Sequence, residues 1–132
     1  MFQSFYLKQF IEIFGAPPKA FDAPGDEAVQ TRLTHRGLHV PEALFDYYSL
    51  FGHHAINNGQ NRLRTIEELE WHDGWLIFME EDQGMVCWGI HHHDLTTPDP
   101  PIWQGMVGEE MEWLQADTPL SRFLIDKWRE IV

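Results

Sequence analysis

Two apolar runs separated by a short polar turn dominate the middle of the chain. Residues 75–79 are Trp-Leu-Ile-Phe-Met, residues 85–90 are Met-Val-Cys-Trp-Gly-Ile, and Glu81-Asp82-Gln83-Gly84 lies between them. This pattern is typical of a β-hairpin, and Gly84 can adopt the positive φ that such a turn often needs. Side chains alternate across a strand, and here both resulting faces are apolar. The pattern therefore predicts two central strands covered on both sides.

The residues before this hairpin predict two helices and a connector. An apolar stripe over residues 4–14, ended by a glycine and two prolines, predicts a helix with Ser4 as its N-cap. A second helix is expected over residues 42–51, directly after a proline that suits a helix start. Residues 19–40 are interpreted as a connector with one helical turn near residues 27–33.

The residues after the hairpin complete the expected fold. Strands are predicted over residues 102–107 and 111–115, and a last helix is capped by Thr118 with a proline at its first position. Helices, then antiparallel strands, then a helix indicate the α+β class. We expect one domain over residues 1–132 with N-terminal helices, a central antiparallel sheet of about four to six strands, and a C-terminal helix.

Charge is distributed unevenly along the chain. The sequence has 9 Lys and Arg against 21 Asp and Glu, a net charge of −12. Between Thr65 and Ser121 there is no Lys or Arg, but there are thirteen acids: Glu67, Glu68, Glu70, Asp73, Glu80, Glu81, Asp82, Asp94, Asp99, Glu109, Glu110, Glu112 and Asp117. Such a field repels nucleic acid and anionic membranes and attracts basic partners. The alternative is that the charge only keeps the protein in solution.

The bulk features indicate an intracellular protein. The single Cys87 excludes an internal disulfide, so nothing points to an oxidising compartment. Residues 1–14 resemble neither a signal peptide nor a membrane span, because polar residues interrupt the apolar ones. We therefore expect a soluble, cytoplasmic protein without a membrane partner.

The order of several short motifs resembles that of the SUKH superfamily, which is named after yeast regulators of cell-wall synthesis and includes bacterial immunity proteins. The motifs span roughly residues 38–125. They are Val40-Pro41-Glu42-Ala43-Leu44, Thr65-Ile66-Glu67-Glu68-Leu69, the segment Phe78 to Ile90, Asp99-Pro100-Pro101-Ile102-Trp103, and Leu120-Ser121-Arg122-Phe123-Leu124.

The resemblance implies a binding protein without a catalytic centre. Many bacterial members of the superfamily neutralise a partner toxin, often a nuclease. The superfamily has no shared catalytic residues, so no site residue follows from it. The chain departs from the pattern in two places: Phe51-Gly52-His53-His54 replaces the Gly-Gly pair that often ends the early helix, and residues 91–94 are unusually rich in histidine.

His91-His92-His93 raises the possibility of a metal site. In extended chain His91 and His93 would share a side while His92 points away, so further ligands would have to come from His53, His54 or His72. We therefore predict a solvated loop, with no metal and no cofactor. Cys87 is expected to be buried, no serine lies in a nucleophile motif, and no catalytic residue is predicted.

The predicted function is a non-catalytic protein-binding module, an immunity protein that neutralises a basic partner such as a nuclease toxin. The acids expected at its interface are Glu81, Asp82, Glu109 and Glu110, because both pairs lie in turns. Trp71 and Trp103, near element ends, are the aromatic candidates. The alternatives are a small metal-dependent enzyme built on residues 91–93 and a regulatory scaffold domain; the sequence does not fix the oligomeric state.

Overall fold

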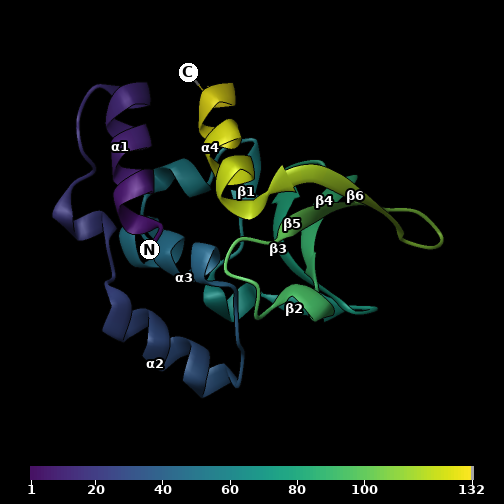
Figure 1. Ribbon diagram of the computed structural model, residues 1–132. Helices are drawn as coiled ribbons and strands as arrows, with labels where there is room; N and C mark the ends of the chain where they lie inside the picture. The colour runs from purple at the N-terminus through teal and green to yellow at the C-terminus, as the bar shows by residue number, and fades with distance from the viewer. Residues whose placement is uncertain (132) are drawn as a thin grey trace.

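The computed structural model describes residues 1–131 and has the α+β architecture that the sequence predicts (Figure 1). Its four helices are α1 (Gln3–Phe14), α2 (Asp26–Arg36), α3 (Glu42–Phe51) and α4 (Leu120–Ile131). Its strands are β1 (Asn61–Leu63), β2 (Glu70–His72), β3 (Trp75–Glu81), β4 (Val86–His91), β5 (Pro101–Met106) and β6 (Glu112–Pro119). None of the helices within residues 1–131 is long and apolar enough to cross a membrane.

The predicted hairpin lies at the centre of a six-stranded antiparallel sheet. The strand order is β1-β3-β4-β5-β6, and the short β2 pairs with β3 as well. β1 and β2 pair with different halves of β3, since Leu63 is opposite Met79 and Glu70 is opposite Ile77. β2 was not predicted from the sequence, because it is only three residues long and all three residues are exposed. Asp73 and Gly74, both at positive φ, connect it to β3.

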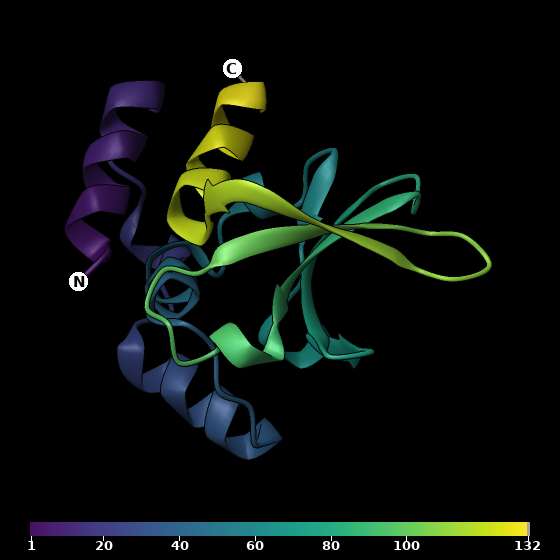
Figure 2. The ribbon, with the colours of Figure 1, turned by 45° about the vertical axis from the view of Figure 1, so that its right-hand side comes forward.

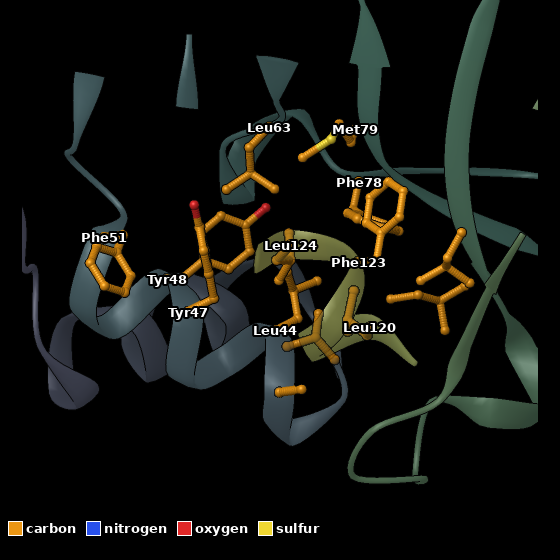
Figure 3. Close-up of a cluster of buried hydrophobic side chains, with 14 of the residues drawn as sticks. Leu44, Tyr47, Tyr48, Phe51, Leu63, Phe78, Met79, Leu120, Phe123 and Leu124 are labelled. Carbon is orange, nitrogen blue, oxygen red and sulfur yellow. The ribbon is translucent and has the colours of Figure 1, made fainter. Parts of the chain in front are cut away.

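The helices cover one face of the sheet, and α4 lies between α1 and the strands in both views (Figures 1 and 2). The core fills the space between them (Figure 3). Leu44 and Phe51 from α3 are fully buried there with Phe78 from β3 and Leu124 from α4. Burial of such side chains contributes roughly 1.5–3 kcal/mol each.

A buried chain of hydrogen bonds ties α4 to α3. The Trp128 indole N–H donates to the Tyr47 hydroxyl at 3.0 Å, and that hydroxyl donates to the Asn57 side-chain oxygen at 2.9 Å. The Asn57 side-chain amide then donates to the carbonyl oxygen of Phe51 at 2.6 Å. Each polar group in this chain therefore has a partner, which removes most of the cost of burying it.

The N-terminal part differs from the prediction in two places. Residues 26–36 form a full helix of 11 residues rather than one turn of a connector. Only Val29 and Leu33 of this helix are buried, so its apolar stripe is too narrow to be recognised. Ser4 does not cap α1: it lies inside the first turn, and Asp46 of α3 accepts the backbone N–H of Phe2 at 2.8 Å instead.

The second face of the sheet is covered by its own indole rings rather than by helices. Trp75 of β3 stacks on Trp113 of β6, with ring centroids 4.9 Å apart and an angle of 11° between the planes. The Trp113 ring reaches across the two intervening strands because Gly89 and Gly105 have no side chains. A Cβ atom at Gly105 would come within 2.9 Å of Trp113 Cζ3. The buried Ile77 and Cys87 share this face by register.

A β-bulge interrupts the alternation in β3. The register shifts between Ile77, opposite Gly89, and Met79, opposite Trp88. Strict alternation would place Met79 on the face of Trp75 and Ile77, but the bulge brings both Phe78 and Met79 into the helix-covered core. Glu80 is consequently opposite Cys87 on the second face.

Candidate functional site

The two acidic loops lie at the same end of the sheet. β3 and β5 end there and β4 and β6 begin there, because all four strands are antiparallel neighbours. The backbone N–H of Val107 donates to the carbonyl oxygen of Met85 at 3.0 Å and joins the two loops directly. Figure 2 shows both hairpin ends projecting away from α1. The fold thus brings Glu81 and Asp82 to the same end as Glu109 and Glu110.

Apolar side chains are exposed between these acids. Met85 is 55% exposed, Met106 39% and Val107 45%. Residues 106–110 and Glu112 also line a shallow hollow in the β5–β6 loop. We call this region the hairpin-end surface; it comprises Glu81, Asp82, Met85, Met106, Val107, Glu109, Glu110 and Glu112. The three apolar members carried no clear sequence signal, because single apolar residues beside turns are common on protein surfaces.

Four of the thirteen acids are paired with arginines from earlier in the chain. The Arg62 guanidinium contacts Glu68 at 2.7 Å, and that of Arg64 contacts Glu80 at 2.8 Å and Glu70 at 2.9 Å. The fourth pair joins Arg32 and Glu67. The structure therefore cancels part of the charge separation that is visible in the sequence.

These ion pairs change the acidity of the carboxyl groups. The Thr65 backbone N–H and the Arg62 guanidinium lower the pKa of Glu68 to about 2. Burial alone would raise the pKa of Glu80, but hydrogen bonds from Arg64 and Arg62 outweigh it, so the pKa lies below its usual value. The Thr65–Glu68 contact is the capping box of a short 3-10 turn, Ile66–Glu68.

The acids of the hairpin-end surface have no such partners. Within residues 1–131, no Lys or Arg forms an ion pair with Glu81, Asp82, Glu109 or Glu110. Asp82, Glu109 and Glu110 are exposed to solvent, and Glu81 is half-buried. The predicted interface acids are thus brought together and left unneutralised.

The two tryptophans predicted for the interface do not lie in this surface. Trp71 is 45% exposed but sits on β2, which pairs with the opposite end of β3. Trp103 is half-buried on the second face of the sheet, with its ring centroid 5.6 Å from that of Trp75. We call Trp75, Trp103 and Trp113 the indole cluster. Trp113, opposite Gly105, lies nearer the hairpin ends than either. Trp113 was not selected from the sequence, because its position depends on the pairing of β6 with β5.

The three consecutive histidines converge at the other end of β4. A 3-10 turn over His92–Asp94 follows β4, so His92 does not point away as extended chain would require. One imidazole nitrogen of each histidine lies within 4.8 Å of the others. Burial and the neighbouring His92 and His93 lower the pKa of His91. His54 lies elsewhere, 3.8 Å from Asp22.

Cys87 occupies the indole-covered face. It is 6% exposed, and burial raises the pKa of its thiol. A protonated, enclosed thiol is a poor nucleophile. This confirms the expectation that Cys87 is buried.

The α+β fold and the hairpin-end surface together describe a protein with an acidic, partly apolar surface at one end of its sheet. Comparison with known proteins adds no relative: no protein-family model, curated protein or solved structure matches the chain.

Proposed function

We propose that this chain is a non-catalytic protein-binding module that engages a strongly basic protein partner through the hairpin-end surface. The observation that carries the proposal is the meeting of two unpaired acidic loops around exposed Met85, Met106 and Val107. By the resemblance to the SUKH superfamily, the partner would be a toxin such as a nuclease, and the chain an immunity protein.

An apolar centre within a charged rim suits protein binding. The apolar side chains lose water on contact and stabilise the complex. The surrounding carboxylates act mainly on encounter, because complementary charge steers a basic partner and raises its association rate. A nuclease displays basic residues where it binds phosphate, so acids on a protein surface can occupy the same place.

The acids are also well placed to act without disturbing the fold. Glu109 and Glu110 lie in the loop between β5 and β6, and Asp82 lies in the turn between β3 and β4. Reversing their charge removes no ion pair within residues 1–131. Binding and stability can therefore be tested separately.

The test compares three baits in capture from lysates of the source cell. The first is the wild type, the second has Glu81, Asp82, Glu109 and Glu110 changed to Lys, and the third is a control with the same change of charge. The control reverses four exposed acids outside the surface: Glu12, Glu27, Asp117 and Asp126. The proposal predicts that a basic protein is retained by the wild type and by the control variant, but not by the variant with Lys at the four hairpin-end positions.

Kinetics with the captured partner make the test quantitative. The hairpin-end variant should associate about ten to a hundred times more slowly than the wild type, with a weaker dependence on salt. The association rate of the control variant should fall much less. Equal rates and salt slopes for all three proteins would mean that the acids only keep the chain in solution, and would refute the proposal.

A further inference from the structure

We propose that the turn His91-His92-His93 binds a divalent first-row transition-metal ion through one imidazole nitrogen of each residue. The three nitrogens already lie within 4.8 Å of one another. The ring centroids are 4.5 Å apart for His91 and His92, and 4.0 Å apart for His92 and His93. One ground for predicting no metal, that His92 points away from His91 and His93, does not hold in the folded chain.

The remaining movement is small. Zn–N bonds of about 2.0–2.1 Å in a tetrahedral site place two ligand nitrogens roughly 3.3 Å apart. Closing from 4.8 Å requires rotation of side chains only, and the exposed His93 has the most room to rotate. His91 Nδ1 accepts a long hydrogen bond, 3.3 Å, from the backbone N–H of His93, a contact weak enough for an ion to replace.

The turn between β2 and β3 orients His92. The backbone N–H of His92 donates to the Gly74 carbonyl oxygen at 2.8 Å, and His92 Nδ1 lies 3.3 Å from the same oxygen. A carbonyl oxygen can only accept, so a hydrogen bond at this contact requires the proton on Nδ1 and leaves the lone pair of Nε2 for an ion. A backbone carbonyl in this role is typical of metal-binding histidines. Gly74 permits the approach, since a Cβ atom there would lie 3.1 Å from His92 Nδ1.

His91 is positioned from the other side. It is the last residue of β4, opposite Trp75 of β3, and its ring packs edge-on against the Trp75 indole at 5.0 Å. Two of the three ligands are therefore held by the sheet before an ion arrives. Such preorganisation reduces the entropy lost on binding.

Imidazole ligands select the kind of ion. They suit Zn²⁺, Ni²⁺ and Cu²⁺ rather than Mg²⁺ or Ca²⁺, and the general order of affinity places Cu²⁺ first. Because His92 and His93 face solvent, water can fill the remaining coordination positions. This inference is independent of the proposed partner, since the turn lies at the end of β4 opposite to the hairpin-end surface.

The test uses the full chain without an affinity tag, stripped with chelator and titrated with Zn²⁺, Ni²⁺ and Cu²⁺ alone by calorimetry. We expect one ion per chain, and each of His91→Ala, His92→Ala and His93→Ala should weaken binding by more than about tenfold. His35→Ala, which removes an exposed imidazole on α2, should leave the affinity unchanged. Cu²⁺ should also quench tryptophan fluorescence, because the Trp75 and Trp103 rings lie 5.0 and 5.9 Å from that of His91.

Three results with the wild type and the histidine variants would overturn the inference, and one with the hairpin-end variant would do so as well. One is an affinity for Zn²⁺ and Ni²⁺ too weak to measure. Another is an equal loss in His35→Ala and in the turn variants, which indicates scattered surface binding. The third is unchanged binding in His92→Ala, which removes the three-ligand site. Lysine substitution of the four hairpin-end acids should not alter the affinity; a loss there would place the ion on the carboxylates instead.

Discussion

Replacing Gly105 with alanine tests whether the indole cluster stabilises the fold. The new Cβ atom would lie 2.9 Å from Trp113 Cζ3 and 3.0 Å from Cys87 Sγ, closer than unstrained carbon contacts allow. Movement of the Trp113 ring away from Gly105 would disturb its stacking on Trp75. Overfilling a packed site in this way costs roughly 1–3 kcal/mol. For a chain of this size we expect the midpoint of thermal unfolding to fall by roughly 4–12 °C.

The assay is unfolding in urea. It is monitored by the near-UV circular dichroism of the stacked indoles and by the far-UV circular dichroism of the backbone. Gly108→Ala is the matched control, because the nearest atom to its Cβ would be a carbonyl oxygen 3.6 Å away. Its stability should change by less than about 0.5 kcal/mol. In a Trp113→Leu background, the loss of unfolding free energy caused by Gly105→Ala should be at most half as large, because the main clash is gone. An equal effect of the two alanine substitutions would refute the close packing of Trp113.

Three further predictions concern the core, the ion pairs and the interface. Trp88→Ala, at a side chain 6% exposed, should lower the free energy of unfolding by roughly 3–5 kcal/mol, whereas Trp71→Ala, at 45% exposure, should cost well below half of that; equal denaturant midpoints would contradict the assigned core. Glu68→Gln should destabilise the protein by about 1 kcal/mol at pH 7, allowing for solvent screening. The folded-state pKa of about 2 lies below the usual 4.5, so this contribution is complete above pH 4.5 and is lost as the pH falls through 2; a difference in urea unfolding that is as large at pH 2 as at pH 7 would refute it. Met85→Ala with Val107→Ala should speed dissociation of the captured partner and leave its association rate nearly unchanged, as measured by surface plasmon resonance.

Local signals in the sequence predicted the central elements well. The hairpin over residues 75–90 and the helix over residues 42–51 were found because their apolar patterns are strong and their ends carry turn or capping residues. The capping box at Thr65 is equally local, since Thr65 and Glu68 stand three residues apart in the sequence. For the region of α2 the sequence predicted only a single helical turn, because this helix buries only two side chains.

Features that depend on distant contacts were not predictable in this way. The cap of α1 comes from Asp46, which is 44 residues away from Phe2 in the chain. The convergence of His91, His92 and His93 needs a 3-10 turn, whereas the alternation rule assumes extended chain. Asp82, Glu109 and Glu110 lie in loops as predicted, whereas Glu81 is the last residue of β3. Their meeting at one end of the sheet depends on the strand order. The partial cancellation of charge by Arg62 and Arg64 likewise follows from the register of the sheet.

The position of β6 at the end of the strand order bears on self-association. Within residues 1–131 this strand has a partner on one side only, and Leu114 on it is 66% exposed. An open strand edge offers unpaired backbone groups to a second chain, which is a common start of aggregation. Here the edge carries Glu112 and Asp117, and Pro119 ends it without an amide donor. Two copies brought edge to edge would therefore bring like charges together, and this repulsion opposes pairing at the edge.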